Sequence, residues 1–214
     1  MINRLLSAPV VAVQTRVDQS TVDLFPAEEA LLAKSVPKRR AEFTAARWCA
    51  RQALAALGEP PAPILPDERG APQWPTGFVG SITHCAGYRA AAVARSTDAH
   101  SLGIDAEPNE PLPEGVLEAV SLPEERTMLR RLGVDRSVSW DRLLFSAKES
   151  VYKAWYPHAR KMLGFDEARL AIAPDGTFTA TLLVPGPIVA GQQLTGFTGH
   201  WLAEDGIVLT AIKH

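Results

Sequence analysis

The chain has 214 residues, of which 46% are hydrophobic and 21% are charged, as in a globular protein with a sizeable core. The net charge is −2, so no overall bias points to nucleic acid or to a membrane surface, and an anion site has to be built locally. The two cysteines, Cys49 and Cys85, form no CxxC pair, and no apolar stretch approaches the roughly 20 residues that span a bilayer. We therefore expect a cytoplasmic protein with free thiols and no membrane segment.

The first part of the sequence predicts a strand followed by two helices. An apolar run at residues 8–13 predicts the strand, and 26–35 predicts a short helix with acidic residues in its first turn. A longer helix is predicted over 37–57, because Pro37 suits its first position and Gly58 suits the cap after its end. Apolar residues recur at helical spacing along this longer segment, and we expect them to face the core.

Three strands are predicted in the middle of the chain. They follow an irregular connection over 58–77, which holds six prolines and three glycines. The segments 78–84 and 88–95 read as a hairpin with a tight turn. The third strand, "HSLGIDAE" at 100–107, ends on two carboxylates and is followed by a proline-rich break.

The C-terminal part predicts two helices and then a β-rich segment. A capping-box pattern at Ser121 and Glu124 predicts a helix to about residue 132. The clearest helix lies over 139–156, and we expect Pro157 to stop it. Two hairpins follow, one from 168–173 and 177–184, the other from 194–203 and 207–214.

A weak internal echo links the two halves of the sequence. In each half a long helix precedes a strand–turn–strand unit that carries a histidine late in its first strand. The echo predicts an α+β protein of two similar lobes, with a boundary near residue 100. The N-terminal lobe would span 1–100 and the C-terminal lobe 101–214.

Asp105 and Glu107, in "GIDAE", are the first candidate site. Side chains alternate along a strand, so these two carboxylates share one face and repel each other unless a positive group lies between them. Hard oxygen ligands of this kind suit Mg²⁺, which usually takes one or two carboxylates together with phosphate oxygens and water. The alternative is an ordinary solvated strand end.

The helix "FSAKESVYKAWY" adds further charged groups. Glu149, Lys153 and Tyr156 share a stripe that differs from its apolar stripe. Glu149 is a candidate third oxygen ligand or general base, and Lys148 and Lys153 are candidate phosphate contacts. The alternative for Glu149 and Lys153 is an exposed salt bridge one helical turn apart.

The third cluster is basic and lies in the long early helix. Arg40, Arg47 and Arg51 share a stripe that suits bidentate binding of phosphate, although a basic helix face is more often simply solvated. His84, beside Thr83 at the end of its strand, is a further candidate phosphate donor. Its alternative role is that of a hydrogen-bonded packing residue.

The sequence contains no Walker A motif, Rossmann glycine fingerprint, GxSxG elbow or zinc-type Cys/His set. Three carboxylates, several cations and no dedicated nucleophile suit transfer of a phosphorus-linked group to an external hydroxyl. The residues alone thus predict a Mg²⁺-dependent enzyme that acts on a polyanionic small molecule. A metal-dependent hydrolase and a non-catalytic binding scaffold are the alternatives.

With these motifs in order, the chain resembles the 4′-phosphopantetheinyl transferases of the Sfp type, near the enterobactin-synthase-associated and actinobacterial branch. Three segments carry the resemblance: 70–94 with "SITHC", 102–109 with "GIDAE" and 145–157 with "KESVYK". It implies two pseudo-symmetric lobes, each a long helix on a small, mostly antiparallel sheet, with the active site in the cleft between them. It also implies Mg²⁺-dependent (or Mn²⁺-dependent) transfer of the phosphopantetheine arm of coenzyme A to a serine of an acyl or peptidyl carrier protein, by a monomer. The released product is adenosine 3′,5′-bisphosphate.

The resemblance assigns roles to individual residues. Asp105, Glu107 and Glu149 match the metal ligands, Glu149 is also the favoured base, and Lys153 matches the residue that meets the leaving phosphate. The residues implied in coenzyme A binding are Arg39, Arg47, Arg69, Thr83, His84, Lys148 and Lys153. Arg69 enters because Pro66 stands where that branch tends to have a lysine.

The helix between the two carboxylate motifs is a candidate docking surface for an acidic carrier protein. Its alternative is a plain amphipathic surface helix. The residues concerned are Leu122, Arg126, Met128, Leu129, Arg130, Arg131 and Arg136.

Overall fold

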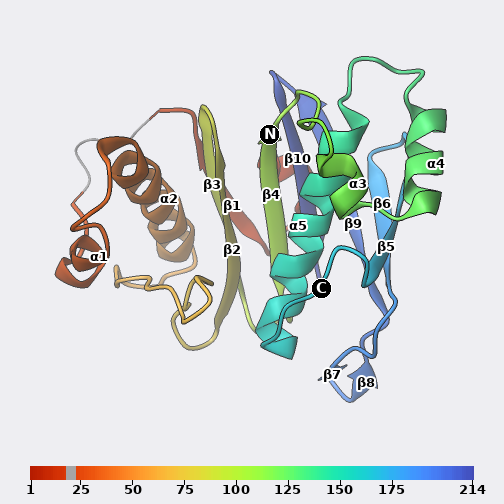
Figure 1. Cartoon of the computed structure of the whole chain (residues 1–214). Helices are drawn as coiled ribbons and strands as arrows, with labels where there is room; N and C mark the ends of the chain where they lie inside the picture. Colours follow the sequence, from red (N-terminus) through yellow and green to blue (C-terminus); the bar gives the residue numbers. More distant parts are fainter. Residues whose placement is uncertain (18–22) are drawn as a thin grey trace.

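The computed structural model describes residues 1–17 and 23–214, whose two larger sheets are each covered by one long helix (Figure 1). A third sheet has only two short strands and lies in the C-terminal half. The helices are η1 (Ile2–Arg4), α1 (Pro26–Leu31), α2 (Pro37–Ala56), α3 (Val116–Val120), α4 (Pro123–Leu132) and α5 (Trp140–Ala159). The strands are β1 (Val11–Thr15), β2 (Phe78–Cys85), β3 (Tyr88–Arg95), β4 (Leu102–Pro108), β5 (Ala168–Ile172), β6 (Thr177–Leu182), β7 (Ile188–Val189), β8 (Gln192–Gln193), β9 (Gly196–Glu204) and β10 (Ile207–Lys213). No helix in the described part of the chain is both long enough and apolar enough to cross a membrane.

The two sheets repeat one plan. The first sheet has the order β1-β3-β2, and the second has the order β4-β10-β9-β6-β5. In each half a first strand leads to the long helix and then to a hairpin, and the last strand of that hairpin pairs with the first strand. The pairing is antiparallel in both sheets. This topology confirms the predicted α+β fold of two similar lobes, and β5 and β6 extend the second sheet only.

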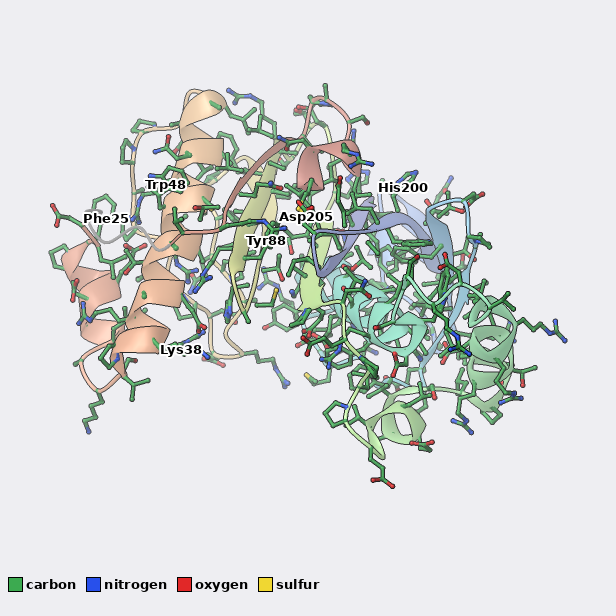
Figure 2. The ribbon with its side chains drawn as sticks, turned by 90° about the horizontal axis from the view of Figure 1, so that it is seen from above. Phe25, Lys38, Trp48, Tyr88, His200 and Asp205 are labelled. Carbon is green, nitrogen blue, oxygen red and sulfur yellow. The ribbon has the colours of Figure 1, made fainter. Side chains whose placement is uncertain are left out.

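Strand β3 is buried on both faces, which explains its run of small residues. Ala91 and Val93 pack with α2, whereas Ala90, Ala92 and Ala94 face the opposite way and pack with residues of β4 and β10. Alanine on both faces lets a helix and a second sheet approach the same strand closely. The fully buried Tyr88 belongs to this shared core and lies between the two halves in the view from above (Figure 2).

Two side-chain hydroxyls join the sheets where β2 and β4 lie side by side. Both are edge strands, and an edge strand presents N–H groups that its own sheet does not pair. The amide of Ile104 donates to Ser81 Oγ (3.1 Å), and the amide of Ala106 donates to Thr83 Oγ1 (2.9 Å). The "SIT" segment of β2 therefore satisfies the buried edge of β4 without a backbone ladder.

Helix α5 packs against strand β4, and the two backbones come very close at Gly103. A Cβ atom at position 103 would lie 2.0 Å from the carbonyl oxygen of Ser150. Next to this contact, Thr210 of β10 bonds with two serines of α5, at 2.7 Å from Ser150 Oγ and 3.0 Å from Ser146 Oγ. Only glycine at position 103 allows this spacing, and the spacing sets how α5 faces the "GIDAE" strand.

The prediction that Pro157 stops α5 is wrong, because the helix continues to Ala159. Pro157 lies in the last turn, so its missing N–H removes a single helical hydrogen bond. The helix ends instead at Arg160, whose backbone is left-handed (φ 52°) and whose amide donates to the carbonyl of Tyr156 (2.9 Å).

The predicted capping box is displaced by one residue, because the predicted helix is α4, and the short helix α3 that precedes it was not predicted. Pro123 occupies the first helical position of α4, which makes Leu122 the cap and Glu125 its partner. The amide of Leu122 donates to Glu125 Oε2 (2.7 Å), whereas Glu124 is exposed. The first strand and the first helix also differ from expectation, since they span Val11–Thr15 and Pro26–Leu31.

We expect Gly103→Ala to lower the free energy of unfolding by about 3 kcal/mol, because the new methyl group would overlap the α5 backbone and force the helix and strand apart. Urea unfolding measures this. Gly133→Ala is the control, since its Cβ would lie at a helix end, 3.3 Å from the carbonyl oxygen of Leu129 and 3.8 Å from that of Arg130. Equal stability of the two variants would contradict the close packing at Gly103.

Candidate functional site

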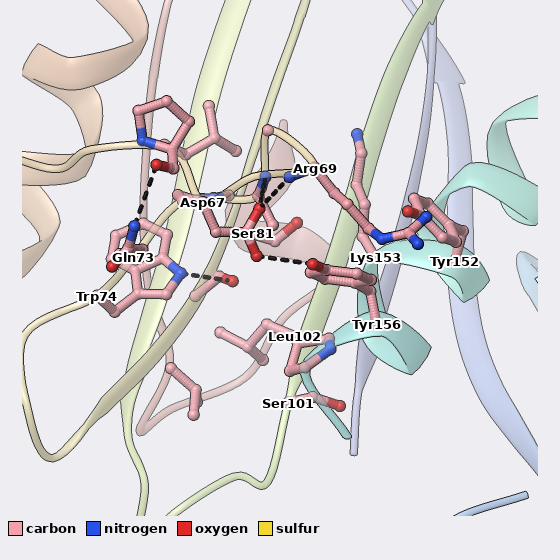
Figure 3. Close-up of a pocket in the computed structure, with 18 of the residues that line it drawn as sticks. Asp67, Arg69, Gln73, Trp74, Ser81, Ser101, Leu102, Tyr152, Lys153 and Tyr156 are labelled. Carbon is pink, nitrogen blue, oxygen red and sulfur yellow. Dashed lines mark hydrogen bonds between the residues drawn. The ribbon is translucent and has the colours of Figure 1, made fainter. Parts of the chain in front are cut away.

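A cleft of about 1340 Å³ opens between the two halves of the molecule. Its walls come from α2, the connection that contains residues 66–74, strand β2 and helix α5 (Figure 3). Six of the residues predicted to act in the site line this cleft, and they are Arg39, Arg47, Arg69, His84, Glu149 and Lys153. Cations from the N-terminal half thus face a carboxylate and a lysine from the C-terminal half.

Asp105 and Glu107 do not line the cleft, but Asp105 is joined to it through Lys153 and is almost fully buried, at 6% exposure. Its Oδ1 accepts hydrogen bonds from Lys153 Nζ (2.7 Å) and Thr83 Oγ1 (3.2 Å). Its Oδ2 is also buried and has no hydrogen-bond partner within residues 1–17 and 23–214. A buried carboxylate oxygen without a partner is costly, and it therefore marks a position where a bound ion or ligand fits.

Glu107 is held by an arginine that the sequence analysis missed. Arg142 Nη1 donates to Glu107 Oε2 (3.1 Å), and the same guanidinium also donates to the carbonyls of Glu110 and Pro111 (both 3.0 Å). Burial and the nearby Asp105 raise the pKa of Glu107, and Arg142 partly offsets this rise. The only sequence signal for Arg142 is its position two turns before Glu149 on the same helix.

Glu149 is half-buried in the cleft. Burial, and then the charge of Asp105, raise the pKa of this carboxyl, while Lys153 opposes the rise. Burial is thus the largest cause of the raised pKa at both Glu107 and Glu149, and repulsion by Asp105 comes second. A cation bound beside these carboxylates would offset both effects.

In the part of the chain that is described, no three His, Cys, Asp or Glu side chains converge closely enough to hold a metal ion by themselves. The carboxylates of Asp105, Glu107 and Glu149 therefore do not form a complete protein cage. Their chemistry fits a hard divalent cation that takes part of its coordination from phosphate oxygens and water.

The basic side of the cleft is built from α2 and β2. Arg39 Nη1 donates to His84 Nε2 (3.0 Å), and partial desolvation together with Arg39 lowers the pKa of His84. Arg47 Nε donates to the carbonyl of Ile64 (2.8 Å), and its guanidinium lies 4.2 Å from the ring centre of Phe43. Burial lowers the pKa of Arg47 to about 10, although Glu28 opposes the shift. Arg47 is therefore fixed in place as a charged group at the cleft wall.

The predicted arginine stripe of α2 divides between two partners. Arg40 pairs with Glu29, and Arg51 Nη1 donates to the fully buried Glu28 (2.9 Å to Oε2). Both glutamates belong to α1, which covers this side of α2. Of the stripe only Arg47 reaches the cleft, and Arg39 joins it there instead of Arg40.

Two residues predicted to contact phosphate have other partners. Lys148 is buried, and its ammonium group donates to Glu125 Oε2 (2.9 Å) and to the carbonyls of Ala168 (3.0 Å) and Phe165. Successive residues of a helix point about 100° apart, so Lys148 turns to β5 when Glu149 faces the cleft. Thr83 is likewise occupied, since its hydroxyl donates to Asp105 and accepts from a β4 amide.

The predicted docking surface is less apolar than expected, since Leu129 is buried while Leu122 and Met128 are half-buried. Leu129 is buried at 7% exposure, and Met128 Sδ accepts a hydrogen bond from the amide of Ile172 (3.1 Å). Arg126 donates to the carbonyl of Ser121 (2.7 Å). What remains exposed is a set of charged groups, Arg130, Arg131 and Arg136.

A second, smaller cavity of about 210 Å³ adjoins the cleft. It shares Glu149 and Tyr152 with the cleft, and its remaining wall is mostly apolar, with Val151, Leu163 and Phe165 among its lining residues. Glu149 therefore borders both the charged cleft and the smaller apolar cavity.

Comparison with known proteins identifies the family. A model described as "4′-phosphopantetheinyl transferase N-terminal domain" matches residues 27–94, and one described as "4′-phosphopantetheinyl transferase superfamily" matches residues 101–210. The chain is 64% identical over 191 residues to 4′-phosphopantetheinyl transferase Svp of Streptomyces mobaraensis, which covers 88% of this chain and 78% of the relative. It is 51% identical over 223 residues to Npt of Nocardia iowensis, with both chains covered completely, and 50% identical over 192 residues to PptT of Mycobacterium tuberculosis, with 87% and 84% covered. The chain belongs to the 4′-phosphopantetheinyl transferase superfamily.

Proposed function

We propose that the cleft binds coenzyme A and that the enzyme transfers its 4′-phosphopantetheine arm to a serine of an acyl or peptidyl carrier protein. The observation that carries this proposal is the meeting of two kinds of charge in one cleft. Arg39 and Arg47 from the N-terminal half face Glu149 and Lys153 from the C-terminal half. Such a site suits a ligand whose phosphates lie next to a reacting centre.

Size and charge both support coenzyme A as the ligand. The cleft volume of about 1340 Å³ exceeds the roughly 300–1,000 Å³ that is usual for drug-sized ligands. Arg39, Arg47, Arg69 and His84 supply donors for several phosphate groups along its wall. The adjoining cavity suits the uncharged pantetheine arm, because its lining is mostly apolar. Glu149 borders both the cleft and this cavity, so the arm and the phosphates would meet near its carboxylate.

A divalent cation, Mg²⁺ or Mn²⁺, is the proposed cofactor. Asp105, Glu107 and Glu149 would hold it together with oxygens of the pyrophosphate, since the three carboxylates do not surround an ion by themselves. When bound, such an ion offsets the negative charge that grows on the leaving bisphosphate.

The transfer needs a base for the incoming serine. In the proposed step the serine oxygen forms a bond to the phosphorus of the pantetheine phosphate, and the bond from that phosphorus to the bridging oxygen breaks. The serine proton passes to Glu149, the carboxylate that lines the cleft. Adenosine 3′,5′-bisphosphate leaves with the bridging oxygen.

Lys153 stabilises the leaving group in this scheme. Two of its N–H groups are bound to the carbonyl of Ile104 (2.9 Å) and to Asp105 Oδ1 (2.7 Å). An ammonium group has three donors, so one is available to the leaving phosphate. Asp105 and the β4 backbone thus fix the lysine in position.

The transferase is tested by intact-mass spectrometry of an apo carrier protein incubated with this enzyme, coenzyme A and Mg²⁺. We expect a gain of one phosphopantetheine group that is lost with EDTA or when the acceptor serine is replaced by alanine. Release of adenosine 3′,5′-bisphosphate with several unmodified carrier proteins would instead identify a hydrolase. Binding of coenzyme A without either reaction would identify the protein as a non-catalytic binding scaffold.

We expect Glu149→Gln to lower kcat at least 100-fold, because the amide cannot take the serine proton. Circular dichroism and the unfolding midpoint should stay close to those of the parent protein, since the side chain faces the cleft. The matched control is Glu118→Gln, an exposed residue of α3. A Glu149→Gln enzyme with the parent rate would remove this residue from the mechanism.

The two lysines of the "KESVYK" segment should differ in their effect on catalysis. Lys148→Ala leaves the buried Glu125 without its cation, with only the amides of Leu122 and Leu170 as donors, so we expect a loss of about 3 kcal/mol in the free energy of unfolding and a kcat of the folded enzyme within twofold of the parent. Lys153→Ala should also lower the free energy of unfolding, because it leaves the buried Asp105 without its cation, and in addition it should lower the kcat of the folded enzyme. Urea unfolding and steady-state kinetics of both variants measure the difference, and a parent-like kcat for Lys153→Ala would reject its assignment.

A further inference from the structure

The loop over residues 65–73, hereafter the 65–73 loop, forms part of the cleft wall beside α5 (Figure 3). It folds back on itself through two backbone hydrogen bonds of 2.8 Å, from Gln73 to Leu65 and from Asp67 to Ala71. The loop belongs to the proline-rich connection of the N-terminal half, whereas α5 belongs to the C-terminal half. Its position relative to α5 therefore depends on contacts between the two.

One carboxylate shapes the loop and also ties it to the helix. Asp67 Oδ1 accepts from the amides of Arg69 and Ala71, both at 2.9 Å. Asp67 Oδ2 accepts from the phenol of Tyr156 (2.7 Å), and Arg160 Nη1 lies 3.5 Å away. Burial alone would raise the pKa of Asp67, but the hydrogen bonds from Tyr156 and the two amides lower it.

Tyr156 places this tie beside the reacting groups. It is 7% exposed and lies one turn beyond Lys153 and two turns beyond Glu149 on the cleft side of α5. Its phenol has no role in the transfer chemistry proposed above. The guanidinium of Arg160 lies 5.8 Å from the centre of the ring and also interacts with the phenol, where it opposes the rise in the Tyr156 pKa that the hydrogen bond to Asp67 causes.

Residues 66–73 all line the cleft, and Arg69 is the cation among them. Its side chain extends from the loop toward Tyr152 of α5 (Figure 3). It lies close enough that its charge opposes the rise in the pKa of Tyr152 that burial causes. The backbone amide of Arg69 donates to Asp67, and Asp67 also accepts from Tyr156. The hydrogen bond to Tyr156 therefore helps to fix the backbone from which the Arg69 side chain extends.

We propose that the hydrogen bond between Asp67 and Tyr156 positions Arg69 to bind a phosphate group of the nucleotide substrate. Asp67 and Tyr156 are positioning residues that set substrate affinity and take no part in the transfer step. Without this hydrogen bond, the 65–73 loop and the long Arg69 side chain would have to be ordered when the ligand binds. The conformational entropy lost in that ordering weakens the affinity. The identity of the ligand rests on the proposed function.

The test compares Tyr156→Phe, Asp67→Asn and Arg69→Ala with the parent enzyme in the carrier-protein assay. We expect Tyr156→Phe to raise KM for coenzyme A about tenfold, the value of a hydrogen bond to a charged group, with kcat within twofold. Asp67→Asn should act in the same direction. Tyr88→Phe is the matched control, since it removes a phenol that donates to Gln14 (2.8 Å) outside the cleft, and its KM should equal that of the parent.

The double variant tests whether the pair acts through Arg69. In the Arg69→Ala background, Tyr156→Phe should change KM less than twofold, because there is no longer an arginine to position. An undiminished effect in this background would overturn the proposal and make Tyr156 a direct ligand contact. A parent-like KM for Tyr156→Phe alone would overturn it as well.

Hydrogen exchange of the ligand-free protein separates this inference from the proposed function. Peptides that span the 65–73 loop should exchange faster in Tyr156→Phe than in the parent, and Tyr88→Phe should leave them unchanged. If the parent protein neither modifies a carrier protein nor binds adenosine 3′,5′-bisphosphate, the proposed function fails. Faster loop exchange in Tyr156→Phe would still support a role of the Asp67–Tyr156 hydrogen bond in holding the loop. Unchanged loop exchange would reject that role, whatever the activity.

Discussion

The close contact between helix α5 and strand β4 is the constraint on which the rest of the structure depends. Gly103 has no side chain, so the backbone of Ser150 packs directly against the strand. This spacing lets Lys153 reach the carbonyl of Ile104 and the carboxylate of Asp105 at hydrogen-bond distance. A larger separation would leave Asp105 buried without its cation, which is an expensive state. The same glycine therefore determines both packing and the electrostatics of the site.

Strand β4 also explains how two sheets can share one site. One of its neighbours is β10, with a regular antiparallel ladder, and the other is β2, which offers the hydroxyls of Ser81 and Thr83 in place of a ladder. Because Thr83 bonds to both β4 and Asp105, the junction between the halves is part of the carboxylate site. Residues that read as substrate contacts in "SITHC" thus serve partly to build the place where the substrate is proposed to bind.

The charges of the cleft follow a division of labour between the halves. The N-terminal half contributes arginines whose positions are fixed by packing, as Arg47 is against Phe43. The C-terminal half contributes carboxylates whose pKa values are raised by burial and mutual repulsion, as at Glu107 and Glu149. A polyanion with a divalent cation satisfies both sides at once, since its phosphates meet the arginines and the cation meets the carboxylates. Neither half can offer this by itself.

Sequence patterns by themselves determined the element types, the two-lobe plan and most of the charged residues of the site, because helical periodicity, alternation and short motifs are local. Only the tertiary structure decided which member of a neighbouring pair faces the cleft, Arg39 or Arg40, Glu149 or Lys148, since a rotation of about 100° separates adjacent helical positions. It also revealed pairs far apart in the chain, such as Arg142 with Glu107 and Asp67 with Tyr156. Such pairs leave no periodic trace in a single sequence, because the distance between their members is set by how the two halves pack.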